Sequence, residues 1–277
     1  LGIHMGDYLL TEAGFGADMG AERFFNIKCR TSSMKPDAAV VVATVRGLKA
    51  HSGRHRIVAG RPLPEALLVE NPDEVYEGGV NLGKQIENIC SHGVTPVVAV
   101  NRFPEDHDTD LAAVAEIAAE FGARSAITNH FSEGGKGAAE LAEVVAEATE
   151  EKSDFSVLYP DEMSLRDKIH TIATRIYGAD DVEFSSQASK QIDSYEANGF
   201  GNLPVCIAKT HLSISSDSSL KGAPTGWTLP VREVRASIGA GFVYPICGDM
   251  RTMPGLGSSP AAMNIDIDKN GEIVGLS

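Results

Sequence analysis

The sequence predicts an α/β fold: a parallel sheet with helices on both faces, followed by a smaller α+β unit. Two observations predict it. In the first 150 residues, short β-branched runs bounded by Gly or Pro alternate with helix-length amphipathic runs, which is typical of a parallel sheet. From about Lys152 this alternation ends. We therefore expect one α/β domain over residues 1–150 and an α+β domain over residues 151–277.

The first unit is predicted to contain four strands and four helices. The strand runs are apolar and β-branched, whereas the helix runs repeat apolar residues three or four positions apart. The expected strands are Asp7–Glu12, Ala38–Val45, Val94–Val100 and Arg124–Thr128, and the expected helices are Ala17–Lys28, Asp73–His92, Asp108–Phe121 and Lys136–Glu150. Because parallel strands end at one edge of their sheet, a ligand is expected at that edge.

The second unit mixes helices with strands in a different pattern. One face of Asp161–Tyr177 is apolar, which indicates a helix packed on a core. The other expected elements are a helix at Ser185–Ala197, strands at Pro204–Ala208, Thr228–Ala236 and Phe242–Cys247, and a terminal hairpin turning at Asp268–Gly271.

The composition disfavours several classes of protein. There are 24 Lys and Arg against 38 Asp and Glu, a net charge of −14 that argues against a nucleic-acid partner. The four cysteines are widely spaced without a C-x-x-C pair, so free thiols in a reducing compartment are expected. No apolar run approaches membrane-spanning length, and the first residues do not form a signal-peptide pattern. We expect a cytoplasmic protein without a membrane partner.

A glycine turn follows the first apolar run. Tyr8-Leu9-Leu10 leads through Glu12 into Gly14-Phe15-Gly16, and a helix is expected from Ala17. Such a turn brings backbone amides close to an anionic ligand, because glycine has no Cβ to block the approach. The alternative is a tight strand-to-helix turn with no ligand. Phe15, with Glu12 and Asp18 near it, favours a binding role.

Asn101 ends a predicted strand and marks a possible nucleotide edge. Phe103 and Asp106 follow it in the loop. Nucleotide switches read a base with a strand-terminal Asn-Lys-x-Asp, and here the Asp comes two residues late. The alternative role for Asn101 is to cap the loop.

Three residues of the second unit are further candidates. Trp227, the sole tryptophan, follows a Ser/Gly/Pro-rich loop and could stack on a flat ring, although tryptophan is often a core residue. His211 could donate to a ligand or be a satisfied loop histidine. Asp249 could bind a ligand amine or support its loop. The histidine spacings predict no metal site.

Several long segments resemble the formate–tetrahydrofolate ligases. The resemblance begins with DYLLTEAGFGADMGAERFF at residues 7–25 and continues in the same order along nearly the whole chain. Further segments are PDAAVVVATVRGLKAHSG, NLGKQIENICSHGVTPVVAVNRF, GFGNLPVCIAKTHLS and VREVRASIGAGFVYPICGDMRTMPGLGSSPAAMNIDID.

The resemblance implies a P-loop NTPase-like first domain and an ATP-dependent ligase. In the family, ATP phosphorylates formate to formyl phosphate, and tetrahydrofolate attacks it to give 10-formyltetrahydrofolate. Magnesium, a monovalent cation and a homotetramer are implied as well. The residues implied are Gly14, Gly16 and Glu12 for catalysis, Asn101 and Phe103 for the nucleotide, and Phe15, Trp227, His211 and Asp249 for folate or ring stacking.

The family's phosphate-binding loop is missing. No G-x-x-x-x-G-K-[ST] occurs, and the nearest run, Glu133–Gly137, has the wrong spacing. The resemblance therefore implies a C-terminal half that needs its N-terminal half and is inactive alone. A non-catalytic folate- or nucleotide-binding or assembly subunit is the alternative. An independent nucleotide switch is disfavoured by the missing loop.

Overall fold

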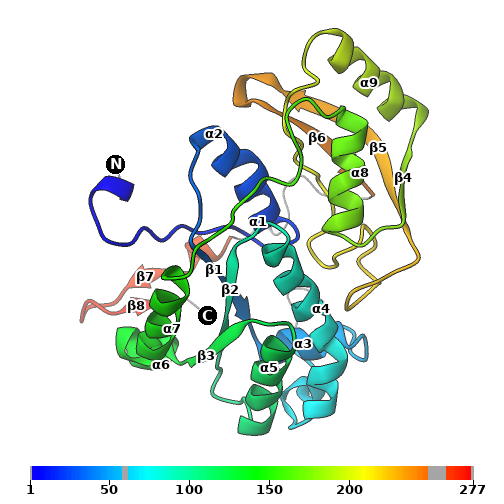
Figure 1. Cartoon of the computed structure of the whole chain (residues 1–277). Coiled ribbons are helices and arrows are strands. Elements are labelled where there is room, and N and C mark those ends of the chain that lie inside the picture. The colour runs from blue at the N-terminus through cyan, green and yellow to red at the C-terminus, as the bar shows by residue number, and fades with distance from the viewer. Residues whose placement is uncertain (1, 58–61, 249–259, 276–277) are drawn as a thin grey trace.

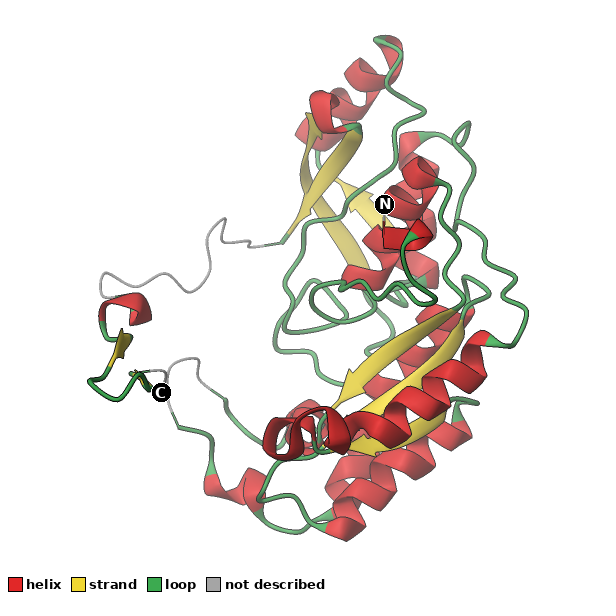
Figure 2. Ribbon diagram, turned by 90° about the vertical axis from the view of Figure 1, so that its left-hand side faces the viewer, coloured by secondary structure: helices red, strands yellow, loops and turns green. Residues whose placement is uncertain are grey.

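The computed structural model describes residues 2–57, 62–248 and 260–275. Two units are each built around a three-stranded sheet, and a short hairpin lies near the C-terminus. Figure 1 places the unit with strands β1–β3 below the unit with β4–β6, and Figure 2 shows both from the side. The chain is therefore α/β, as the sequence predicts.

The first sheet is parallel and has the order β1-β2-β3. Its strands are β1 (Ala38–Ala43), β2 (Thr95–Asn101) and β3 (Arg124–Thr128). Asn101 lies beside Thr128 in the register, so the carboxyl ends of β2 and β3 meet at one edge. Three of the four strands expected in this unit are thus confirmed.

Helices lie on both sides of this sheet (Figure 1). Helices α3 (Val45–His51), α4 (Pro72–Cys90) and α5 (Asp108–Glu120) pack on one side, and α6 (His130–Glu133) and α7 (Ala139–Thr149) lie on the other. Helix α3 was not predicted, because its seven residues follow β1 without a glycine or proline boundary. Short 3-10 turns occupy Gly2–His4, Glu65–Leu68 and Gly134–Ala138.

The expected strand Asp7–Glu12 was wrong. These residues form no strand, and Tyr8 and Leu10 are 57% and 83% exposed. A strand exists only where a neighbour accepts its backbone hydrogen bonds, and no described residue pairs with this run. The helix expected from Ala17 instead begins at Gly20.

That helix is continuous but irregular. It consists of α1 (Gly20–Arg23), a π-helical stretch (Phe24–Cys29) and α2 (Arg30–Ser32). Figure 1 shows it between the two units. Arg30 donates to Asp161 at 2.6 Å, and the Asn26 side chain accepts from the Leu158 amide at 2.7 Å. The first unit's helix therefore anchors the start of the second unit.

The second sheet is mixed, with β4 (Asp181–Phe184) parallel to β5 (Thr228–Ser237) and β5 antiparallel to β6 (Phe242–Cys247). Helices α8 (Leu165–Arg175) and α9 (Ser186–Ala197) accompany it. The expected strands at β5 and β6 and both helices are confirmed, whereas β4 was not predicted. The hairpin of β7 (Asp266–Ile267) and β8 (Ile273–Val274) matches the expected terminal turn.

The expected strand Pro204–Ala208 was also wrong. Only two isolated bridges form, Val205 with Val243 and Ala208 with Ile246. Backbone bonds to β6 are made at alternate residues: the amides of Cys206 and Ala208 donate to the carbonyls of Val243 and Pro245. The segment is held against β6 but does not complete a strand.

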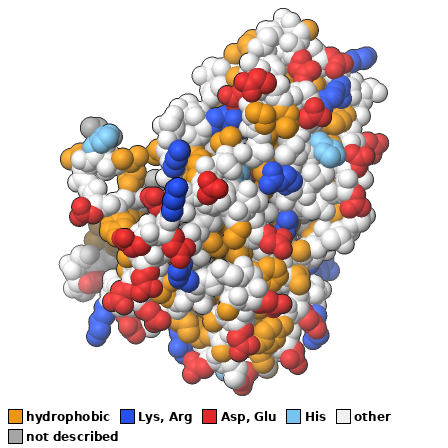
Figure 3. Space-filling model, viewed as in Figure 1, with side chains coloured by type: hydrophobic (Ala, Val, Ile, Leu, Met, Phe, Trp, Pro, Cys, Tyr) orange, Lys and Arg blue, Asp and Glu red, His pale blue; other side chains and the backbone are white. Residues whose placement is uncertain are grey.

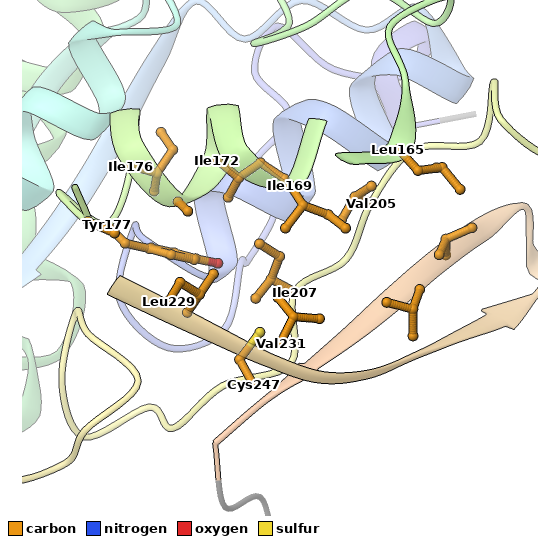
Figure 4. Close-up of a cluster of buried hydrophobic side chains, with 14 of the residues drawn as sticks. Leu165, Ile169, Ile172, Ile176, Tyr177, Val205, Ile207, Leu229, Val231 and Cys247 are labelled. Carbon is orange, nitrogen blue, oxygen red and sulfur yellow. The ribbon is translucent and has the colours of Figure 1, made fainter. Parts of the chain in front are cut away.

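The second unit has a closed hydrophobic core. Ile169 and Ile172 of α8 and Ile176 at its C-terminal end pack in one cluster with Leu229 and Val231 of β5 (Figure 4). All five are at most 1% exposed. The apolar face predicted for this helix is therefore the face that packs on the sheet.

The visible surface carries charged side chains of both signs. Figure 3 shows Asp and Glu side chains spread across the face seen in Figure 1, with hydrophobic atoms exposed between them. Within the described residues, no helix is long and apolar enough to cross a membrane.

Candidate functional site

The glycine turn opens the helix between the two units. The amides of Met19 and Gly20 donate to the Gly16 carbonyl at 3.0 and 2.8 Å. A Cβ on Gly20 would lie 1.9 Å from the Gly14 carbonyl oxygen, and a Cβ on Gly16 would lie 2.6 Å from the Asp18 carboxylate. Glycine is thus required at both positions by close approach.

Phe15 has an unusual backbone in this turn. Its φ is +60°, a left-handed conformation that aromatic residues rarely adopt. Its side chain is 65% exposed. A Cβ on Gly14 would meet no atom within 4 Å, so the turn is open on that side. The structure therefore leaves the predicted anion-binding turn accessible.

Asp18 is fixed by two partners under the turn. Its amide donates to the Gln85 side-chain oxygen at 2.8 Å, and the Gln85 amide group donates back to the Asp18 carboxylate at 3.1 Å. The Lys209 ammonium lies 2.8 Å from the same carboxylate. Burial lowers the pKa of Lys209, and the charge of Asp18 opposes that shift.

The turn also meets a loop of the second unit. The Phe15 and His211 rings stack with centroids 5.0 Å apart and planes 25° apart. Both side chains are exposed. Two of the predicted site residues, 196 positions apart in sequence, are thus brought together. Glu12, three residues before Phe15, is exposed. It makes no hydrogen bond or ion pair with the described residues.

A second carboxylate is buried one turn further along the helix. Glu22 is 1% exposed. Burial raises the pKa of Glu22 to about 8, although the Asn26 amide group donates to it at 3.0 Å. Its other oxygen has no partner among the described residues. Burial therefore favours the protonated form of Glu22.

At the predicted nucleotide-binding edge, a hydrogen bond holds the loop after β2, and the Asn101 side-chain amide has no partner among the described residues. The Phe103 amide donates to the Asp106 carboxylate at 2.8 Å, so Asp106 supports the loop. The Arg46 guanidinium lies 3.7 Å from the centroid of the Phe103 ring. The Asn101 side chain makes no hydrogen bond with the described residues, so it does not cap the loop here.

The sequence did not predict two exposed apolar residues at this edge of the first sheet. Phe131, at the start of α6, is 89% exposed, and Ile127, at the end of β3, is 40% exposed. Phe131 follows the Asn101 partner Thr128 by three residues. An aromatic residue three positions after a strand end was the available signal.

Trp227 is a partly buried residue of the second unit. It packs against the core of the second unit, and its indole N–H donates to the Pro224 carbonyl at 3.0 Å. A pocket of about 320 Å³ lies nearby, lined by residues of α4, Tyr177 and the loop before Trp227. None of the predicted site residues lines it. Asp249 lies outside the described residues.

The comparisons with known proteins decide the family. The family model described as formate–tetrahydrofolate ligase matches residues 1–277. The chain belongs to this family. It is 71% identical over 271 residues to a formate–tetrahydrofolate ligase of Saccharopolyspora erythraea, covering 98% of this chain and 48% of that protein. A ligase of Cutibacterium acnes is 58% identical over 276 residues, covering 100% and 49%.

The resemblance found in the sequence is therefore confirmed, and the relatives are ligases by name. The chain spans about half the length of the curated relatives it matches. Among the described residues, no three His, Cys, Asp or Glu side chains gather in a group that could hold a metal ion.

Proposed function

We propose that this chain is the C-terminal half of an ATP-dependent formate–tetrahydrofolate ligase that makes 10-formyltetrahydrofolate through formyl phosphate. The observation that carries the proposal is the family match over all 277 residues. The three parallel strands then belong to a P-loop NTPase-like sheet, whose phosphate loop comes from the N-terminal half.

The glycine turn is proposed to hold the acyl phosphate. Formyl transfer needs donors aimed at the developing negative charge and a position shielded from water. The amides of Gly14 and Gly16 supply such donors, and the open side at Gly14 leaves room for an anion. Glu12 is proposed to orient the attacking amine of tetrahydrofolate.

The edge of the sheet is proposed to take the nucleotide. The Asn101 amide is available to read a ring edge, and the Phe103 ring lies beside the strand end with the Arg46 guanidinium over it. Phe131 is exposed at the same edge and is a further candidate for stacking. Magnesium is proposed to enter with ATP, bound through the phosphates of the nucleotide. The monovalent cation is inferred from the family alone.

The ring of tetrahydrofolate is proposed to lie near the Phe15–His211 stack. Trp227 and Asp249 remain further candidates, although Trp227 packs on a core in this structure. Flat heteroaromatic rings stack on exposed aromatic faces. The exposed position of both stacked rings supports this assignment.

An exposed apolar surface supports the proposal that an N-terminal half packs on this chain. Val40 and Val42 of β1 are 44% and 65% exposed, and Tyr8 and Leu10 are exposed as well. In parallel sheets both faces are normally covered. We infer that the N-terminal half covers this surface, that the whole enzyme is a cytoplasmic homo-oligomer, and that the partners are formate, tetrahydrofolate and ATP.

Reconstitution tests the proposal. The chain is assayed for ATP-dependent formylation of tetrahydrofolate alone and with the N-terminal half of the Saccharopolyspora erythraea relative. No product is expected from the chain alone, and turnover is expected from the mixture. Gly16→Val should abolish the turnover, whereas Gly239→Val, whose Cβ would meet no atom within 4 Å, should retain it. Formylation by the chain alone would refute the proposal. A complex that binds both ligands without turnover would favour a non-catalytic subunit.

A further inference from the structure

We propose that the buried Asp18–Lys209 ion pair is a positioning pair that holds the Phe15–His211 stack in place across the two units. The role of this ion pair in catalysis rests on the function proposed above, in which the stack binds the flat ring of the substrate. The structural part of the proposal stands independently of that function.

The stack itself has little to hold it. Phe15 is 65% exposed and its backbone has a φ of +60°, so neither burial nor backbone preference fixes the ring. His211 is also exposed. Such a ring pair is worth about 0.5–1.5 kcal/mol beyond the area it buries. The alignment of these rings must therefore come from the segments that carry them.

The ion pair is buried, and every proton of its ammonium group has an acceptor. Lys209 is 0% exposed, and its three ammonium protons have three acceptors: Asp18 at 2.8 Å and the carbonyls of Thr210 and Ser213 at 3.1 and 2.7 Å. The ammonium also lies 4.9 Å from the centroid of the Tyr177 ring. Asp18 is held in turn by Gln85 of α4. One geometry satisfies all of these partners.

The pair lies close to both rings along the chain. Asp18 follows Phe15 by three residues, and Lys209 precedes His211 by two. Consecutive Cα atoms are 3.8 Å apart, so no more than about 11 Å of chain separates either ring from the pair. A shift between the units at the ion pair would thus be transmitted directly to the stack.

A comparison with another buried pair supports a positioning role. In the described residues, two ion pairs have both partners more than nine-tenths buried, namely Asp18–Lys209 and Lys49–Asp110. Lys49 and Asp110 both belong to the first unit and join α3 to α5. Buried ion pairs often stabilise no better than apolar side chains, and their best-attested use is to fix register. Of these two buried pairs, only Asp18–Lys209 joins the two units.

The test reads the stack by NMR on the 277-residue chain. Histidine is selectively labelled, and His211→Asn assigns the His211 signal. Phe15→Leu removes the ring-current shift that Phe15 imposes and so defines its size. The variant Asp18→Leu/Lys209→Met replaces the pair by apolar groups of similar volume, which commonly preserves folding. It should remove at least half of the shift. Lys49→Met/Asp110→Leu is the matched control and should leave the shift unchanged.

Retention of the full shift in the Asp18→Leu/Lys209→Met variant would overturn the proposal. If that variant does not fold, Asp18→Asn decides, because it keeps the shape and the bond to Gln85 but loses the charge. It should reduce the shift measurably, and an unchanged shift would again overturn the proposal.

A second measurement concerns catalysis in the reconstituted enzyme. The apolar replacement should raise the KM for tetrahydrofolate about tenfold and leave the KM for ATP within twofold, corresponding to about 1.4 kcal/mol for the ring substrate. Equal increases in both KM values would contradict positioning of the ring. A wild-type complex without turnover would count against the proposed function, whereas the NMR result would still decide the role of the pair.

Discussion

The two sheets of the molecule differ in how completely they are covered. In the second unit, Val231, Val234 and Val243 are at most 1% exposed, and α8 closes the core. In the first unit, β1 has a free edge among the described residues, and its Val40 and Val42 are 44% and 65% exposed. Among the described residues the core of the second unit is covered, whereas the first unit presents a surface that normally lies under other structure.

The sequence pattern of β1 agrees with this difference. Ala38–Ala43 is apolar throughout, a pattern typical of a strand buried on both faces. In the structure residues of α4 and α5 cover the face around Val41 and Ala43, whereas α7 on the other side leaves Val40 and Val42 exposed. The sequence of this strand is typical of burial on both faces, but this chain alone leaves Val40 and Val42 exposed.

Alanine substitutions should separate the two sheets most strongly. Ile172→Ala removes a fully buried side chain from the closed core and should lower the free energy of unfolding by about 2–5 kcal/mol. Val42→Ala changes a 65% exposed side chain and should cost no more than about 0.5 kcal/mol. Urea unfolding of both variants measures this. Equal losses would mean that Val42 is buried in solution, for example by self-association.

Glu22, in the helix between the two sheets, should make the free energy of unfolding depend on pH. The pKa of Glu22 is raised to about 8 in the folded protein, above its value in the unfolded chain. Its contribution is therefore fully present below the unfolded pKa and is lost as pH rises toward 8, by at most about 1.4 kcal/mol per pH unit. Glu22→Gln cannot titrate, so its unfolding free energy should fall less between pH 5 and 8. A slope as steep as that of the wild type would contradict the assignment.

The smallest effect expected is spectroscopic. Trp227 is the sole tryptophan, so all indole emission reports the loop beside the second core. If the proposed ring contact exists in the reconstituted enzyme, tetrahydrofolate should quench the emission with a saturating curve, and Trp227→Phe should keep most of the affinity. Emission that ignores both tetrahydrofolate and ATP, together with a lower Tm for Trp227→Ala, would make Trp227 a core residue only.

Local patterns were sufficient for most of the fold. The runs that became β2 and β3 each begin two residues after a glycine and pack against helices within the chain, so their pattern and their structure agree. Asp7–Glu12 and Pro204–Ala208 were expected as strands because they are apolar. Strand formation depends on a partner that the run itself does not encode.

The candidate site was only partly predictable, for a similar reason. The glycine turn could be recognised locally, because close backbone approach requires glycine. The contact of Phe15 with His211 depends on the Asp18–Lys209 pair, which joins segments almost two hundred residues apart. Phe131 was missed because its exposure depends on how α6 leaves β3.

Association with the N-terminal half tests the central claim most directly. The affinity of the chain for the N-terminal half of the Saccharopolyspora erythraea relative is measured for the wild type, Val42→Asp and the matched control Val69→Asp, which is 60% exposed outside the β1 surface. If β1 is the covered surface, Val42→Asp buries an unpaired charge and should weaken binding at least about 100-fold. Val69→Asp should stay within twofold of the wild type. Equal binding by all three chains, or no binding by any of them, would contradict the account.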